Sequence, residues 1–237
     1  MEKDIKEQAK AQIFNVIILD KSGSMNSIRK AAINGFNETL ASIKKAQEKY
    51  ADTQKHFVTL VAFCGCGNQM IFDKVPANEA NPLTAAEYEP CCTTPLFDAM
   101  GFTLTSMQKH VKSIHNALVV VTIITDGEEN ASKEYNGKAI KSLVESLKND
   151  GWTFTYMGAN QDSIEVAISL SIRNARNFDY CEEGTKAGFA KESSTRMNLF
   201  ERMHAFSCRS DKSSPKNFKA ACSRMADEAF DEEAAKA

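Results

Sequence analysis

The sequence has no long hydrophobic run and no surplus of charge of either sign. None of its apolar stretches approaches the about 20 residues that a helix needs to cross a bilayer, so no membrane segment is expected. Its 29 Lys and Arg residues and 31 Asp and Glu residues give a net charge of −2. Proteins that bind nucleic acid usually carry a basic surplus, so no nucleic-acid partner is expected. The first residues, 1–7, are charged and lack the apolar core of a signal peptide, which favours a cytoplasmic location.

The chain also lacks a cysteine pattern typical of a disulfide-bonded protein. It contains seven cysteines, an odd number, in a chain of 237 residues. A chain of this length buries enough apolar surface to fold without covalent links, so we expect reduced thiols. The hydrophobic fraction of 43% and charged fraction of 25% are ordinary for a globular protein. The length of 237 residues predicts one α/β domain with additions, or two small domains.

Two apolar runs, the second interrupted only by Thr122, each lead to a carboxylate. The first run, 16–19, is followed by Asp20 and then by two hydroxyls at alternate positions, Ser22 and Ser24. The second run, 117–124, is followed by Thr125 and Asp126. Such runs are typical of strands buried on both faces of a parallel sheet. Oxygen atoms at the strand ends suit a hard cation such as Mg²⁺, although Asp20 could instead begin a turn and Ser24 could cap a helix.

Strand and helix patterns alternate through most of the chain. This alternation predicts an α/β fold, a doubly wound and Rossmann-like sheet that is mostly parallel and six-stranded, with helices on both faces. A turn rich in Gly and Asn between the second and third strands predicts a hairpin, so the third strand should be antiparallel and at the sheet edge. The expected strands are 16–19, 57–63, 70–72, 117–124, 152–157 and 177–180. The expected helices are 28–50, 96–111, 136–149, 162–170 and 183–203.

Three motifs at predicted strand ends and loops resemble the metal-ion-dependent adhesion site (MIDAS) of the von Willebrand factor type A (VWA) domain family. They are Asp20-Lys21-Ser22-Gly23-Ser24, Thr94-Pro95-Leu96-Phe97-Asp98 and Thr125-Asp126-Gly127. The resemblance implies a VWA-like domain over 13–203, an N-terminal extension over 1–12, and a C-terminal tail over 204–237 that is part-helical or poorly ordered.

The resemblance also implies a ligand set and a partner. The metal ligands, direct or through water, would be Asp20, Ser22, Ser24, Thr94 and Asp126. Thr93 is adjacent to Thr94 and could replace it, but the residues that follow Thr94 match the family pattern best. The ion would be Mg²⁺, with Mn²⁺ or Ca²⁺ as substitutes, and an acidic residue of a partner protein would complete its coordination. Asp98 is expected to support or cap this region, and Glu128 and Glu129 to form a solvated acidic rim.

Four cysteines depart from the family pattern. Cys91 and Cys92 precede Thr94, where glycine is common in the family, and Cys64 and Cys66 lie in the hairpin turn. Both segments should lie at the same edge of the sheet, so four thiols could come close together. A tetrahedral zinc site or a redox pair is one interpretation. Inert cysteines that are buried or partly exposed are the other.

The motifs favour a binding module over an enzyme. A Mg²⁺-dependent phosphoryl-transfer enzyme that uses Asp20 is an alternative, as is a scaffold subunit with an unused metal site. Phosphatases with an aspartate nucleophile carry a second Asp two residues later, and this chain has Ser22 there. Neither a phosphate-binding Gly-rich loop nor a Gly-x-Ser-x-Gly elbow occurs. We therefore expect a protein that holds an acidic residue of its partner through the metal and that catalyses no reaction.

Overall fold

A six-stranded sheet forms the centre of the computed structural model, which describes residues 10–158, 162–178, 181–208 and 215–234. The strand order is β3-β2-β1-β4-β5-β6, and every neighbouring pair is parallel except the antiparallel β2 and β3. The predicted sheet is therefore confirmed, including its antiparallel edge strand. The strands are β1 (Ala11–Asp20), β2 (Gln54–Cys64), β3 (Gly67–Pro76), β4 (Ala117–Thr125), β5 (Thr153–Gly158) and β6 (Ala175–Asn177).

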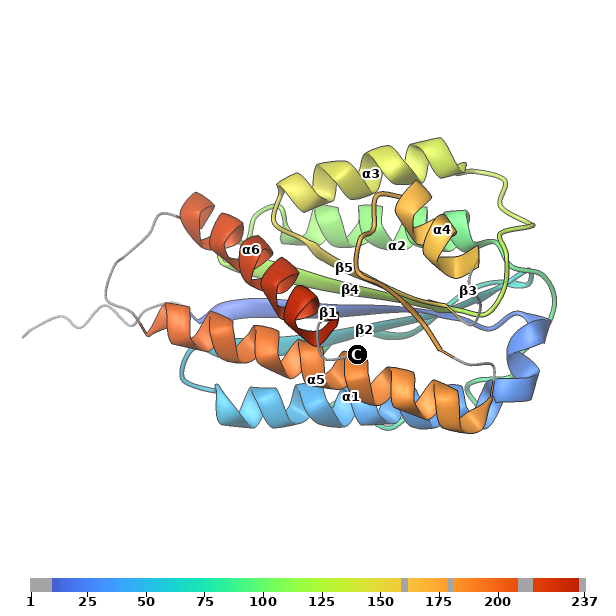
Figure 1. The fold of residues 1–237 in the computed structure, drawn as a ribbon, viewed down its shortest axis with the longest axis horizontal. Coiled ribbons are helices and arrows are strands. Elements are labelled where there is room, and N and C mark those ends of the chain that lie inside the picture. Colours follow the sequence, from blue (N-terminus) through green and yellow to red (C-terminus); the bar gives the residue numbers. More distant parts are fainter. Residues whose placement is uncertain (1–9, 159–161, 179–180, 209–214, 235–237) are drawn as a thin grey trace, which may run out of the picture.

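Helices cover both faces of this sheet. In Figure 1, α2, α3 and α4 lie on one side of the strands, and α1 and α5 lie side by side on the other. The helices are η1 (a 3₁₀ helix, Gly23–Ile28), α1 (Arg29–Lys49), α2 (Leu96–Val111), α3 (Gly137–Asn149), α4 (Asp162–Ser169), α5 (Glu182–Ser207) and α6 (Pro215–Ala234). Among the described residues, no helix is both long and apolar enough to cross a membrane.

The central strand β1 is buried on both faces, which explains its uninterrupted apolar run. Val16 and Ile18 pack in a core cluster with α2 and α3, whereas Ile17 and Leu19 pack in a second cluster with α1. Successive side chains of a strand point to opposite faces, so one strand supplies both cores. This double burial fixes the position and direction of the strand end that carries Asp20.

The edge strands differ most from their predicted bounds. Strand β3 runs over ten residues, whereas only 70–72 were apolar enough to be predicted. Most of its side chains are exposed or half-buried, so the rest of the strand carries no hydrophobic signal. Strand β6 lies at Ala175–Asn177 rather than 177–180, and residues 179 and 180 lie outside the described part of the chain.

Within the expected C-terminal tail 204–237, residues 215–234 form helix α6, which packs against the sheet and α5. Helix α5 continues to Ser207, and α6 buries Cys222, Ala226 and Ala229 in a third core cluster. This cluster includes Leu199 of α5 and residues of β1 and β4. At the other end of the chain, β1 begins at Ala11 and so overlaps the expected extension 1–12, of which residues 1–9 lie outside the described part.

Candidate metal centre

The two carboxylates predicted from the strand ends lie on neighbouring strands. Strands β1 and β4 pair in parallel, with Leu19 opposite Ile124. Asp20 and Asp126 therefore follow adjacent strands at their carboxyl ends. This is also the point where the chain order of the sheet reverses, since β2 and β4 lie on opposite sides of β1. Ligands bind in the crevice at such a reversal in doubly wound sheets.

The loop after β1 connects the two carboxylates through hydroxyl groups. The Ser22 amide donates to Asp20 Oδ1 at 2.6 Å, and the Ser24 hydroxyl donates to Asp126 Oδ1 at 2.7 Å. The two serine hydroxyl oxygens are 3.1 Å apart. Ser22 stands at the N-cap of η1 without a capping hydrogen bond from its side chain. Ser24 lies inside η1 and its hydroxyl donates to Asp126, which argues against the interpretation that Ser24 caps the helix.

The Thr94 hydroxyl, from a third segment of the chain, lies near the oxygens of Asp20 and Ser24. A β-carbon placed on Gly127 would lie 3.0 Å from Thr94 Oγ1, 3.5 Å from Ser24 Oγ and 3.6 Å from Asp20 Oδ2. Thr93 points elsewhere, since a β-carbon on Gly65 would lie 2.3 Å from its hydroxyl oxygen. The structure thus brings together Asp20, Ser22, Ser24, Thr94 and Asp126, which we call the oxygen cluster. Metal binding by this cluster stays a prediction.

Comparisons with known proteins identify the fold. No protein-family model matches the sequence, and a search of curated proteins gives no match. Among solved structures, the SpRpn10 VWA domain aligns with a TM-score of 0.51 and 8% identity, over 77% of this chain and 95% of that one. The chain has a von Willebrand factor type A fold.

Two further solved structures resemble this VWA fold. The manganese-loaded TRAP protein of Plasmodium vivax has a TM-score of 0.51 and 14% identity, over 75% of this chain and 72% of that one. The pilus adhesin SpaC of Lactobacillus rhamnosus GG has a TM-score of 0.59 and 14% identity over 81% of this chain. The chain spans only 31% of the SpaC chain. At these identities the likeness concerns the fold.

The electrostatics of the oxygen cluster in this VWA fold favour a bound cation. The pKa of Asp20 is raised to about 6, chiefly by burial and to a smaller extent by the neighbouring Asp126, against hydrogen bonds from Thr125 and Ser22. The adjacent Lys21 does not neutralise this charge, because its ammonium donates to Gln69 on β3 at 2.7 Å. Two carboxylates in one buried place repel each other, and a divalent cation would remove that repulsion.

One carboxylate oxygen also lacks a partner. Asp126 Oδ2 is buried and has no hydrogen bond among the described residues. A buried acceptor without a partner costs about 1–3 kcal/mol, and more when it is charged. Ser24, in contrast, is exposed, so the cluster is open to solvent on that side. Carboxylate and hydroxyl oxygens are ligands that suit Mg²⁺, and the residues present therefore fit such an ion.

Three residues that the sequence did not single out position the oxygen cluster. The Thr125 hydroxyl donates to Asp20 Oδ2 at 2.6 Å, and the Tyr88 hydroxyl donates to the Asp20 carbonyl oxygen at 2.6 Å. Asn130 Oδ1 accepts from the Thr94 amide at 2.9 Å. Thr125 is the last residue of β4 and belongs to the third motif, and Asn130 follows that motif by three residues, so both could have been considered. Tyr88 lies in an irregular loop, and its role depends on contacts distant in sequence.

The expectation of a solvated acidic rim is wrong for Glu129. Its carboxylate accepts from the Phe97 amide at 2.8 Å and from the Ser132 amide at 2.7 Å, and so joins the start of α2 to the loop after β4. Glu128 is exposed. Asp98 also supports this loop, because it accepts from the amides of 133, 134 and 135 at 2.8–2.9 Å. Burial acts to raise the pKa of Asp98, but the hydrogen bonds from these amides together hold it below its usual value.

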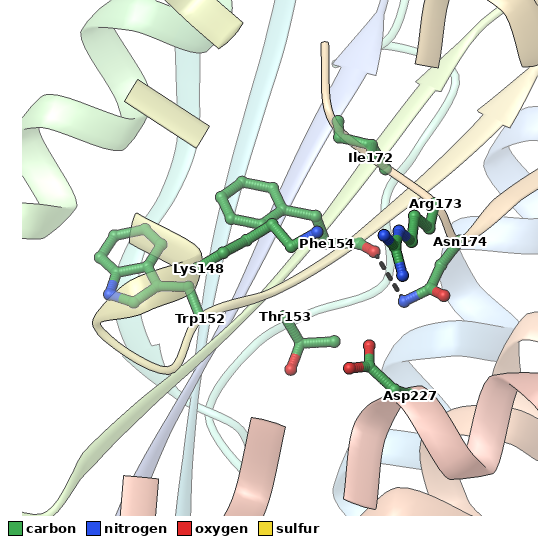
Figure 2. A pocket seen from close by; sticks show the side chains of 8 residues that line it. All are labelled: Lys148, Trp152, Thr153, Phe154, Ile172, Arg173, Asn174 and Asp227. Carbon is green, nitrogen blue, oxygen red and sulfur yellow. Dashed lines mark hydrogen bonds between the residues drawn. The ribbon is translucent and has the colours of Figure 1, made fainter. Parts of the chain in front are cut away.

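A separate small pocket lies away from the oxygen cluster. Its walls include Thr153 at the start of β5, Asn174 before β6 and Asp227 of α6, which faces the other two (Figure 2). Asn174 Nδ2 donates to the Phe154 carbonyl oxygen at 3.2 Å. Strands β1, β4 and β5 are parallel, and Asp20 stands at the carboxyl end of β1. The start of β5 therefore lies at the opposite end of the strands from Asp20. The pocket results from the packing of α6 and does not adjoin the cluster.

Proposed function

We propose that this VWA fold is a divalent-metal-dependent protein-binding module. Its oxygen cluster would hold Mg²⁺, directly or through water, with Mn²⁺ or Ca²⁺ as substitutes. When bound, the ion would supply a positive site that accepts a carboxylate from an acidic residue of a partner protein. The observation that carries this proposal is the convergence of oxygens from three segments beside a buried carboxylate oxygen that has no hydrogen-bond partner in the part of the chain that the structure describes.

The charge of the cluster supports partner binding. Only two of the five side chains are carboxylates, and the other three are neutral hydroxyls. Such a set leaves a coordination position for a water or for an acidic ligand. The exposed Ser24 marks the side from which a partner would approach. Two solved structures with a similar fold agree with this proposal, since one is a pilus adhesin and the other was determined with manganese.

The surroundings of Asp20 argue against phosphoryl transfer. The side chain is fully buried, and both of its carboxylate oxygens accept hydrogen bonds, from the Ser22 amide and the Thr125 hydroxyl. A nucleophile needs an oxygen that can reach the substrate. A cytoplasmic location, as the sequence predicts, is part of the proposal and would supply millimolar-range Mg²⁺ without oxidising the thiols.

Metal binding can be tested without a known partner. We expect the wild-type chain to bind Mn²⁺ in electron paramagnetic resonance titrations, and Mg²⁺ to compete. Asp126→Ala should abolish this binding. Asp150→Ala should not change it, because Asp150 is an exposed residue at the C-terminal end of α3, three residues before β5 begins. The proposal fails if Asp126→Ala binds Mn²⁺ as tightly as the wild type.

Partner binding is the second step of the test. The wild-type chain, immobilised in the presence of Mg²⁺, should capture a partner from the native cell extract, and EDTA should release that partner. The immobilised Asp126→Ala variant should fail to capture it. The captured protein should lose binding when its acidic contact residue is replaced by the amide. Capture that survives both EDTA and Asp126→Ala would contradict a metal-mediated contact.

A further inference from the structure

Four cysteines lie together beside the oxygen cluster and have no part in the function proposed above. Cys64 ends β2, Cys66 lies in the turn before β3, and Cys91 and Cys92 precede Thr94. The sulfur of Cys91 lies 3.5 Å from that of Cys64 and 3.8 Å from that of Cys66. The sulfurs of Cys66 and Cys92 are 3.0 Å apart. We call these four residues the thiol cluster.

We propose that the thiol cluster binds one Zn²⁺ in a tetrahedral site that fastens the Thr94 loop to the β2–β3 hairpin. Zn²⁺ takes four thiolates at about 2.3 Å, which places the sulfurs about 3.8 Å from one another. Two of the observed separations are close to this value, and the sulfurs of Cys64, Cys66 and Cys91 all lie within 4.8 Å of one another. Cys92 would join this group of three as the fourth ligand. Its sulfur is 3.0 Å from that of Cys66, a separation that needs to open by less than about 1 Å, and both side chains are exposed.

The backbone at Cys92 supports a role for its thiol. Cys92 has a positive φ of 63°, a left-handed conformation that glycine adopts without a steric penalty. A residue with a β-carbon held there costs about 1–3 kcal/mol, and such residues concentrate at functional sites. A cysteine at this position is therefore unfavourable for the fold alone. A bound metal that uses the sulfur would offset that cost.

Backbone hydrogen bonds already join the segments that carry the thiols. The Gly65 amide donates to the Thr93 carbonyl oxygen at 2.8 Å, and the Cys91 amide donates to the Lys21 carbonyl oxygen at 2.8 Å. The Gly23 amide donates to the Cys92 carbonyl oxygen at 3.0 Å. The hairpin, the cysteine pair and the serine loop thus form one assembly in which a zinc ion would be an additional link.

The chemistry of the thiols also suits a metal. Cysteine sulfurs are soft ligands, and structural Zn²⁺ sites commonly use them. Two exposed members give the ion a path from solvent. A disulfide between Cys66 and Cys92 is the competing arrangement. It would join only two of the four sulfurs and would leave Cys64 and Cys91, which are 3.5 Å apart, to contact each other or to form a second disulfide.

The test begins with wild-type protein purified in the presence of a reductant. We expect one zinc per chain by mass spectrometry of the metal content. After zinc is removed under reducing conditions, addition of Co²⁺ should produce the ligand-field and sulfur-to-metal absorption bands of a tetrahedral thiolate site. Added Zn²⁺ should displace the cobalt and bleach these bands. Absence of thiolate bands in the wild type would overturn the proposal, as would a Cys66–Cys92 disulfide found in the reduced preparation.

Variants separate this site from other metal and thiol sites. Cys66→Ser with Cys92→Ser should lose the cobalt–thiolate bands, and Cys181→Ser with Cys208→Ser should keep them, since these exposed thiols lie outside the cluster. Asp126→Ala should also keep the bands, so a failure of the oxygen cluster to bind metal would leave this result unaffected. Equal loss of the bands in the matched control pair would overturn the assignment.

Discussion

Burial of Asp20 predicts that the metal-free protein loses stability as the pH rises. The pKa of this carboxyl is raised from an ordinary value of 3.8 to about 6 in the folded chain, mainly by burial. Because the folded state holds the proton more tightly, the stabilising contribution is fully present below about pH 4. It is lost as the pH rises through about 6. The difference between the two pKa values corresponds to about 3 kcal/mol of unfolding free energy.

Asp20→Asn tests this reasoning because it removes the ionisation and nearly preserves the shape. In EDTA at pH 7.5 the variant should be more stable than the wild type, by up to about 3 kcal/mol. This difference should shrink towards zero near pH 4, where the wild-type carboxyl is protonated. Added Mg²⁺ should reverse the order, since a ligand that binds only the folded wild type stabilises it. Urea unfolding followed by circular dichroism at each pH supplies the free energies.

Asp150→Asn is the matched control, because this exposed carboxylate lies far from the oxygen cluster. Its unfolding free energy should follow that of the wild type at every pH and in Mg²⁺. Equal stability of Asp20→Asn and the wild type in EDTA at both pH 5 and pH 7.5 would refute the burial argument. Equal stabilisation of both proteins by Mg²⁺ would instead refute the role of Asp20 in holding the ion.

Three further predictions concern packing. Arg196→Met should lower the unfolding free energy, measured by urea unfolding, by about 3–5 kcal/mol, because it leaves Glu192 buried without its 2.8 Å ion pair. The double variant Arg196→Met with Glu192→Met should recover most of this loss. Gly35→Ala should lower the unfolding free energy by about 1–3 kcal/mol, because the new β-carbon would lie 2.0 Å from the Phe189 ring. Gly137→Ala should be tolerated, because its new β-carbon would have its nearest neighbour at 3.5 Å. Ala229→Glu should cost about 2 kcal/mol or more by placing a carboxyl in the buried face of α6, and Ala220→Glu on the exposed face of the same helix should be close to neutral in the same assay.

The parts of the fold with a local signal could be predicted from the sequence. The run 117–124 identified β4, and Pro95, a residue that suits the first turn of a helix, marked the start of α2. Since β1 and β4 are each buried on both faces, their apolar runs also located the carboxylates at their ends. The convergence of Asp20, Ser24 and Asp126 followed from the parallel arrangement and from the resemblance of the motifs.

The parts without a local signal could not be predicted. Most of β3 is an exposed or half-buried edge, so its polar residues did not indicate a strand. Helix α6 buries alanines and a cysteine, which are small side chains that fit close helix contacts but give little hydrophobic contrast in the sequence. The contact of Tyr88 with the Asp20 carbonyl oxygen spans 68 positions of the chain and depends on the loop conformation. Such contacts follow from the tertiary structure alone.

The segment from Cys91 to Thr94 links two sets of ligand atoms with opposite metal preferences. Its thiols are soft ligands that favour Zn²⁺, and its Thr94 hydroxyl belongs to a set of hard oxygens that favours Mg²⁺. The two sets use no residue in common, so each would select its own ion even though they are only two residues apart. The same short segment donates or accepts backbone hydrogen bonds with Lys21, Gly23 and Gly65. A change in the thiol cluster, by metal loss or oxidation, would therefore displace Thr94 and the serine loop together. Under the two proposals, the soft site would set the geometry of the hard one, and the hard one would contact the partner.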